Sequence, residues 1–233
     1  MIDNNEIILP KGYISWSQLE IWEKSPERYK REYFTDGSKL DTDALRFGKF
    51  IASSIERVLE LEKEGYNKLE IIPMIMSELA MDYLTAETLV NLEKGEVAEH
   101  KMFQDIKGIK CLSFIDSYYT DTSNFREYKT GKIPWTQAKV QKHGQLLFYA
   151  TMLTHISGKM PHHCHLDWIE TENVERGEMD GLGHEQPKLK LTGRITTFER
   201  EFDSREIDGM EQRIVRVATE ISNAYKQYLS EQF

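Results

Sequence analysis

Apolar residues follow two different spacings along the chain. Over residues 13–95 they recur every three or four positions, as in amphipathic helices, most clearly from Asp43 to Lys63. Over residues 96–202 short apolar stretches alternate with polar residues, as in strands, and helical spacing returns at about residues 204–229. The pattern predicts one α/β domain over residues 1–233, with a helical N-terminal part, a mixed sheet flanked by helices, and a C-terminal helix.

Residues that cap or stop helices divide the helical part. Ser15 and Gln18 have the spacing of a capping box, and the pair Ser25-Pro26 ends one helix and begins the next. Gly48 lies inside the longest helix, where glycine often marks close packing against a neighbour. The predicted helices span about residues 13–24, 26–34, 43–63, 73–84 and 86–94, the last with Thr85 as its cap.

The predicted sheet contains a β-hairpin with charged residues near its turn. Glu127 and Lys129 share one face of the second strand, and Tyr128 points the other way. Asp116, near the end of the first strand, comes beside Glu127 if the two strands pair. The predicted strands span about residues 98–104, 111–119, 124–129, 163–171 and 188–202, with an acidic, Gly-rich hairpin region at 176–186.

A long helix is predicted at about residues 136–156, after the hairpin. Gln141, Gln145 and Tyr149 recur on it every four residues and would form one continuous polar stripe. The stripe either borders a functional site or carries polar side chains to solvent.

Composition narrows the classes of function. The formal net charge of −9 argues against unselective coating of DNA, because basic surfaces drive such binding. A local basic groove is still compatible with this net charge. Two cysteines, Cys111 and Cys164, are too few for a disulfide framework or a four-cysteine cluster, as expected in a reducing cytoplasm. The start has no basic, apolar leader and no stretch is long enough to span a bilayer, so we expect a cytoplasmic protein without a membrane partner.

The hairpin residues suit metal chemistry. The carboxylates of Asp116 and Glu127, completed by a backbone carbonyl and waters, offer the hard oxygen ligands that Mg²⁺ or Mn²⁺ prefers. Lys129 beside them can orient a nucleophilic water or stabilise negative charge on a phosphoryl oxygen. The alternative for the three residues is a charged strand edge.

Two further clusters have competing interpretations. Arg28, Lys30 and Arg31 alternate with aromatic residues, which fits either a surface for nucleic acid or a solvated helix face. The run from His162 to His165 invites a zinc hypothesis. On a strand, however, His163 and His165 lie opposite Cys164, so the four side chains cannot converge without a turn, and we predict no metal site in this run.

The joint pattern resembles a known superfamily. An aspartate on one strand, then Glu127-Tyr128-Lys129-Thr130-Gly131, then Gln145 and Tyr149 on a helix resemble the RecB-like branch of the PD-(D/E)XK nucleases. The segments SWSQLEIWEKSPERYKREYF and RFGKFIASSIE are similar to that branch's opening helices, so the resemblance covers nearly the whole chain. It implies a restriction-endonuclease-like core with an N-terminal helical extension.

The resemblance also implies roles. Asp116 and Glu127 would bind the divalent metal with the Tyr128 carbonyl, Lys129 would be catalytic, and Gln145 and Tyr149 would border the site. The implied reaction is metal-assisted hydrolysis of DNA phosphodiesters in recombination, repair, CRISPR or phage DNA processing, in a bacterial or phage-infected cell. Exonuclease and endonuclease activity both stay open, and a helicase or recombination protein acting in trans is a further candidate partner.

The chain departs from the branch at the metal site. Ala52 stands where the branch has a metal-binding histidine, and Glu56, one helical turn further on, is either a replacement ligand or a surface carboxylate. Ser25 replaces the cysteine usual before Pro26 and the C-terminal cysteine trio is missing, so we expect no Fe–S cluster. These departures leave two alternatives: a nuclease-like module that binds DNA or a partner protein without cutting, and an enzyme of another class or a structural subunit on the same fold.

Overall fold

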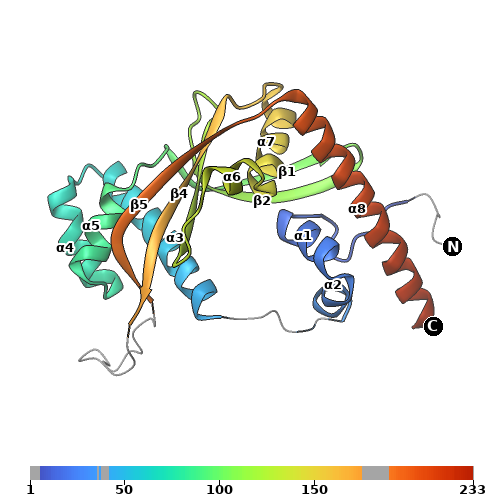
Figure 1. The fold of residues 1–233 in the computed structure, drawn as a ribbon, viewed down its shortest axis with the longest axis horizontal. Coiled ribbons are helices and arrows are strands. Elements are labelled where there is room, and N and C mark those ends of the chain that lie inside the picture. The colour runs from blue at the N-terminus through green and yellow to red at the C-terminus, as the bar shows by residue number, and fades with distance from the viewer. Residues whose placement is uncertain (1–5, 36, 38–41, 175–188, 233) are drawn as a thin grey trace.

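The computed structural model describes residues 6–35, 37, 42–174 and 189–232 (Figure 1). Five helices precede the first strand, two lie between β3 and β4, and a long helix follows the last strand. The elements are α1 (Trp16–Lys24), α2 (Pro26–Tyr33), α3 (Asp43–Lys63), α4 (Lys68–Leu79), α5 (Tyr83–Asn91), β1 (Val97–Ile106), β2 (Ile109–Tyr118), β3 (Phe125–Gly131), α6 (Gln137–Gln141), α7 (Gly144–Ser157), β4 (His163–Asn173), β5 (Leu189–Glu201) and α8 (Ser204–Glu231).

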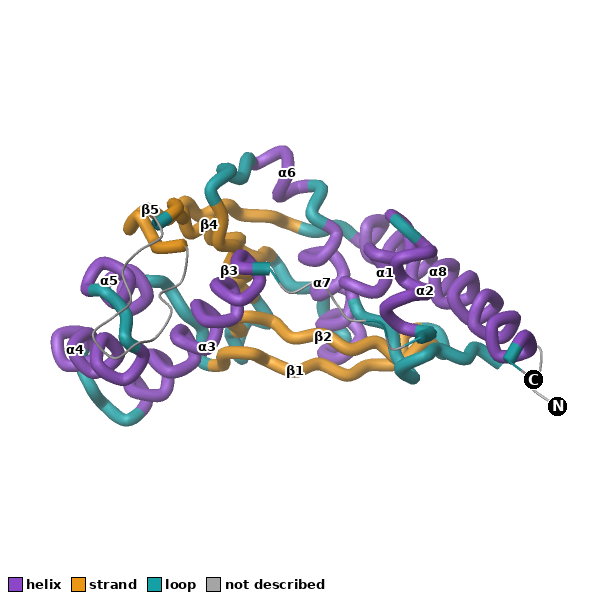
Figure 2. The backbone as a smooth tube through the Cα atoms, turned by 90° about the horizontal axis from the view of Figure 1, so that it is seen from below, coloured by secondary structure: helices purple, strands orange, loops and turns teal. Residues whose placement is uncertain are grey.

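The five strands form one sheet in the order β1-β2-β3-β4-β5. All neighbours are antiparallel except β3 and β4, which are parallel because α6 and α7 carry the chain back between them. Figure 2 shows β1 and β2 as long strands, with α3 to α5 near one end and α1, α2 and α8 near the other. The predicted α/β class, mixed sheet with flanking helices and helical N-terminal part are confirmed.

Apolar side chains gather in two buried clusters. One joins α1, α2, α7 and α8 to the sheet, with Tyr29, Phe125 and Phe148 among its fully buried residues. The other joins α3, α4 and α5 to β4 and β5 around Ile55 and Ile169. Both clusters reach β3 or β4, so the middle of the sheet is fixed by packing from helices at both ends.

Several local predictions are confirmed. The hydroxyl groups of Ser15 and Ser25 accept the capping hydrogen bonds that begin α1 and α2, with Pro26 at the first position of α2. Helix α3 spans the predicted residues 43–63. A Cβ on Gly48 would lie 3.8 Å from Thr130 Oγ1, an ordinary van der Waals contact, so α3 does pack against β3 at this glycine, with room for a methyl group. The acidic region predicted at residues 176–186 lies outside the described residues.

The predicted helix 73–84 is wrong in its position. Asn67 and Glu70 form a capping box, so α4 begins at Lys68 and contains Pro73 in its interior. Proline has no backbone N–H, so at Pro73 the Leu69 carbonyl lacks its helical hydrogen bond. Leu69 is 83% exposed, so water can reach this carbonyl. Ala80 then ends the helix in the left-handed conformation, with a φ of 51°.

The predicted cap Thr85 is also wrong. Helix α5 begins at Tyr83, three residues before the predicted start, and the Asp82 carboxylate accepts a hydrogen bond of 2.8 Å from the Thr85 backbone N–H. Asp82 is favoured over Thr85 as the N-cap because its carboxylate also accepts a hydrogen bond from the Thr85 hydroxyl group, at 3.0 Å.

The helix predicted at 136–156 is two helices, α6 and α7, separated at Lys142–His143. A Cβ on Gly144 would lie 2.1 Å from the Trp16 ring, so Trp16 sets where α7 begins. The buried Arg200 guanidinium donates a hydrogen bond of 2.6 Å to the His143 carbonyl and holds the break. The predicted stripe is therefore interrupted: the Gln141 side chain donates to the Glu199 carbonyl at 3.4 Å instead of continuing toward Tyr149.

Candidate metal and catalytic site

Asp116 lies where β2 and β3 begin to diverge. The two strands pair only at Ser117–Arg126 and Tyr118–Phe125, one residue beyond Asp116. Asp116 Oδ2 then accepts a hydrogen bond of 2.7 Å from the Tyr128 backbone N–H. This contact brings the Asp116 carboxylate to the part of β3 that carries Glu127.

Glu127, Lys129, Gln145 and Tyr149 form one chain of hydrogen bonds. Lys129 Nζ donates to Glu127 Oε1 at 2.5 Å and to Gln145 Oε1 at 2.8 Å. Gln145 Nε2 in turn donates to the Tyr149 hydroxyl group at 2.6 Å. The structure therefore brings the residues predicted on β3 and on α7 into one site with Asp116.

Charge and burial set the protonation of the site. Burial raises the pKa of Asp116 well above its usual range, and the Glu127 charge raises it further. Burial lowers the pKa of Lys129, but the charges of Glu127 and Asp116 outweigh that effect, so the pKa is raised and the ammonium stays charged. Burial, then Glu127 and Asp116, also raise the pKa of Tyr149 well above its usual value, so its hydroxyl group keeps its proton.

The donor atoms fit a hard divalent cation. Glu127 Oε2 is buried and has no hydrogen-bond partner within the described part of the chain, although Oε1 is bonded to Lys129. A buried carboxylate oxygen left this way is costly unless a ligand or water completes it. Burial first and the Glu127 charge second raise the pKa of Asp116, and a bound cation would offset both effects by stabilising the charged carboxylate. Asp116 and Glu127 are thus the residues here that can hold Mg²⁺ or Mn²⁺.

The remaining predicted ligands are the Tyr128 carbonyl and Glu56. The Tyr128 side chain turns to the other face of β3 and donates a hydrogen bond of 2.7 Å to the Glu93 carbonyl, so only its backbone faces the site. Ala52 is partly buried on α3, and Glu56 is exposed one turn further along that helix. Whether Glu56 or the Tyr128 carbonyl binds metal stays a prediction.

Glu99 is a site residue that the sequence interpretation missed. It lies on β1 between the pairs Ala98–Ser117 and His100–Ile115, hence opposite Asp116, with a positive φ of 49°. Burial raises its pKa, and Glu56 and Glu127 raise it further, so its carboxyl group senses both charges. The only signal in the sequence was an acid on a predicted strand, without a spacing that singles it out.

The basic residues of α2 are largely paired within their own helix. Arg28 Nε lies 2.6 Å from Glu32 Oε1, and Lys30 Nζ lies 2.8 Å from Glu27 Oε1. Arg31 is exposed. These pairs within one helix are typical of a charged helix face in contact with solvent. A contact of this face with nucleic acid stays a prediction.

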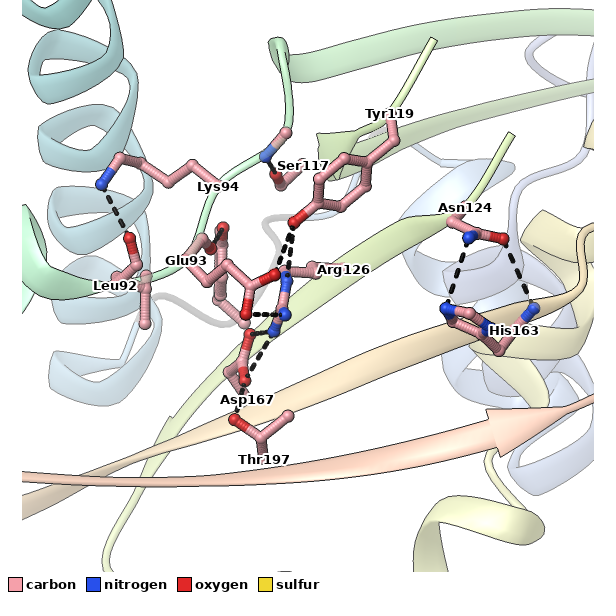
Figure 3. A network of polar contacts seen from close by, with 12 residues as sticks. Leu92, Glu93, Lys94, Ser117, Tyr119, Asn124, Arg126, His163, Asp167 and Thr197 are labelled. Atoms are coloured by element: carbon pink, nitrogen blue, oxygen red, sulfur yellow. Dashed lines mark hydrogen bonds and ion pairs between the residues drawn. The ribbon is translucent and has the colours of Figure 1, made fainter. Parts of the chain in front are cut away.

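The opposite face of β3 carries a buried ion-pair network (Figure 3). Arg126, 3% exposed, donates to both oxygens of Asp167 at 2.8 and 3.1 Å and to the Tyr119 hydroxyl group at 3.0 Å. Arg126 also pairs with Glu93, and Thr197 donates to Asp167 at 2.5 Å. The network joins β3, β4, β5 and the end of the helical part directly behind Glu127.

An open hollow of about 480 Å³ adjoins the site between α1 and β2. Gln145 and Tyr149 line one part of it, and Tyr13, Trp16 and Phe114 give it aromatic walls. Phe114, 44% exposed, lies two residues before Asp116 and therefore on the same face of β2.

Several solved structures match this chain, among them two that are named as exonucleases. One is a protein from Eubacterium rectale named as an exonuclease: it is 15% identical, with a TM-score of 0.47, over 91% of this chain and 83% of that one. The other is a phage-related exonuclease from Haemophilus somnus 129PT, 16% identical with a TM-score of 0.46, over the same shares of the two chains. No family model matches the chain, and the search of curated proteins found no match. The described part of the chain contains no helix with the length and apolarity of a membrane span.

Proposed function

We propose that this protein is a divalent-metal-dependent DNA nuclease of the RecB-like PD-(D/E)XK type. The observation that carries the proposal is the buried Glu127 carboxylate, which binds Lys129 through Oε1 while its Oε2, beside Asp116, has no hydrogen-bond partner among the described residues. Two carboxylates and one ammonium in contact suit phosphodiester hydrolysis, because the reaction needs an activated water and stabilised phosphoryl charge.

Asp116 and Glu127 would hold Mg²⁺ or Mn²⁺, with the Tyr128 carbonyl and Glu56 as further candidate ligands. The bound cation would supply Lewis acidity toward a phosphoryl oxygen and lower the pKa of water. A water oxygen attacks phosphorus, the bond from phosphorus to the leaving oxygen breaks, and a phosphomonoester and a free hydroxyl group result.

Lys129 acts at the reacting atoms. Its ammonium, held by Glu127 and Gln145, keeps its charge because its pKa is raised, so it orients the water or stabilises negative charge on the phosphoryl group. Gln145 fixes the position of Lys129. The Tyr149 hydroxyl group in turn fixes Gln145, because it accepts a hydrogen bond from the side-chain amide of Gln145. The catalytic residues we propose are therefore Asp116, Glu127 and Lys129, with Gln145 and Tyr149 as positioning residues.

The hollow beside the site offers a place for the DNA strand. Its aromatic walls at Tyr13, Trp16 and Phe114 suit stacking with bases, which tolerates any sequence. Arg28, Lys30 and Arg31 on α2 remain a candidate contact for the DNA backbone. We place the activity in recombination, repair or phage DNA processing in a bacterial or phage-infected cytoplasm, with a helicase or recombination protein as a candidate partner.

A second candidate is a module that binds DNA or a partner protein without cutting. Ala52 in the position of the branch's histidine and the net charge of −9 favour it, because both weaken the hold on metal or on DNA. Incubation of the purified protein with linear, nicked and circular DNA in Mg²⁺ or Mn²⁺ separates the two: a nuclease converts at least one form, and a binding module retains DNA without converting it.

A further inference from the structure

Two histidines and a glutamate converge on the face of the sheet opposite Lys129. His163 and His165 lie two residues apart on β4, so their side chains share a face, and the buried Cys164 points the other way. The antiparallel register of β5 places Glu199 directly beside His165. Neighbouring β3 places Arg126 beside His165, and Arg126 occupies the face opposite Glu127 and Lys129.

The ligand atoms are close enough for one ion. One nitrogen from each of His163 and His165 and one oxygen from Glu199 all lie within 4.8 Å of one another. His163 Nδ1 is 3.6 Å from Glu199 Oε1, and the two imidazole rings are 5.1 Å apart at 74°. Small side-chain rotations would bring these atoms to the bond lengths of about 2.0–2.2 Å that zinc requires.

The surroundings already orient one of the histidines. Asn124 Nδ2 donates to His163 Nε2 at 3.3 Å (Figure 3). The neutral ring therefore carries its proton on Nδ1, which faces Glu199. Binding of an ion at Nδ1 would move this proton to Nε2 and turn the Asn124 amide so that its oxygen accepts from Nε2, the arrangement that metal-binding histidines have. The side chains of His163 and Glu199 are 35% and 57% exposed, so an ion can enter from solvent.

We propose that His163, His165 and Glu199 form a binding site for a borderline transition-metal ion such as Zn²⁺, distinct from the carboxylate site of Asp116 and Glu127. Two imidazoles and one carboxylate are the donor set of zinc, cobalt, nickel and copper sites, whereas Mg²⁺ favours oxygen donors. Three protein ligands leave a fourth position open for water or for exposed Glu201, which β5 places beside His163.

Nearby charge does not oppose the ion. Arg126 is the nearest cation on the adjacent strand, but Asp167 and Glu93 neutralise it. Bound metal would link β4 to β5 and so stabilise the edge of the sheet that lies behind the catalytic strand.

The test is titration of the full-length protein with Zn²⁺, and with Co²⁺ followed by its visible absorption. Asp116→Asn protein, in which the carboxylate site is impaired, is titrated in parallel so that the two sites are counted separately. We expect one equivalent that persists in Asp116→Asn, shows the absorption of imidazole-bound Co²⁺, and raises the thermal midpoint.

Ligand variants locate the ion. His163→Ala and His165→Ala should each weaken Zn²⁺ binding by more than about tenfold, since loss even of an outer partner of a ligand costs that much. Glu199→Gln should also weaken it. His162→Ala is the matched control, an exposed neighbour outside the cluster, and should bind as wild type does.

Circular dichroism of the metal-free variants separates loss of binding from loss of folding. If a histidine variant is unfolded, the exposed Glu199→Gln variant tests the site in its place. Binding unchanged in all three ligand variants, or absent at micromolar Zn²⁺ in the wild type, overturns the proposal. Neither outcome bears on the proposed nuclease activity, which depends on Asp116, Glu127 and Lys129.

Discussion

Asp116 Oδ2 accepts a hydrogen bond of 2.7 Å from the Tyr128 backbone N–H, and this contact ties β2 to the catalytic strand just where the two strands separate. It places a carboxylate whose pKa is raised beside the Glu127 carboxylate, whose second oxygen has no hydrogen-bond partner in the part of the chain that the structure describes. The metal-free site thus holds negative charge that the fold does not fully compensate.

Asp116→Asn should stabilise the metal-free protein at neutral pH. Because the pKa of Asp116 is raised in the folded state, folded protein binds the proton more tightly than unfolded protein. Ionisation therefore costs stability as pH rises above the ordinary aspartate pKa of about 3.9. In EDTA, the thermal midpoint of Asp116→Asn should exceed that of wild type at pH 8, and the difference should vanish near pH 4. Excess Mn²⁺ should reverse the order by stabilising only the wild type; a variant less stable than wild type at pH 8 in EDTA contradicts this account.

Gln145→Leu should slow catalysis without removing the metal. Lys129 donates to Gln145 at 2.8 Å, and a hydrogen bond to a charged group is worth about 1.5–3 kcal/mol, or about 10–100-fold in kcat if it is used in the transition state. Steady-state cleavage kinetics give kcat, and Mn²⁺ titration gives the affinity, which should stay unchanged. Gln141→Leu is the control, because Gln141 lies on α6 away from Lys129 and its variant should keep full kcat. Equal losses in both variants would mean that the contact with Lys129 is not what matters.

Gly144→Ala should destabilise the protein and displace Gln145. The added methyl group would lie 2.1 Å from the Trp16 ring, and overpacking of this kind costs about 1–3 kcal/mol. Gly209→Ala on α8 meets nothing within 4 Å and should be neutral or stabilising, because alanine favours a helix. Denaturant unfolding of both variants gives the comparison, and a neutral Gly144→Ala would show that Trp16 does not set the start of α7.

Arg126→Ala should be among the most destabilising substitutions. It leaves the Asp167 carboxylate, 1% exposed, without its charged partner, and breaking a buried pair in this way costs about 3–5 kcal/mol. Arg194→Ala removes an arginine whose side chain is 72% exposed, paired with Glu170, and should cost less than about 1 kcal/mol. Urea unfolding measures both; similar losses in the two variants would show that the network behind Glu127 adds little.

Local patterns predicted much of this molecule, and long-range contacts account for what they missed. The 43–63 helix, the caps at Ser15 and Ser25 and the hairpin of β2 and β3 depend on residues close in sequence. The break between α6 and α7 depends instead on Trp16 and Arg200, which are distant in the chain.

The same distinction applies to the site. Asp116, Glu127 and Lys129 stood out by their order along the chain. Glu99 joins them only because β1 pairs with β2, and Arg126 supports them only through partners on β4 and the end of the helical part. The assignment of residues 1–233 to one domain stays a prediction.

The central claim is that Asp116, Glu127 and Lys129 hydrolyse DNA with a divalent metal. The most direct test is cleavage of linear and circular DNA in Mn²⁺ by wild type, Asp116→Asn, Lys129→Ala and Lys142→Ala, the last an exposed lysine outside the site. We predict metal-dependent cleavage by wild type and Lys142→Ala, lost in EDTA, and loss in Asp116→Asn and Lys129→Ala while both variants remain folded. Cleavage of no DNA form by the wild type, or undiminished cleavage by folded Asp116→Asn and Lys129→Ala, would contradict the account.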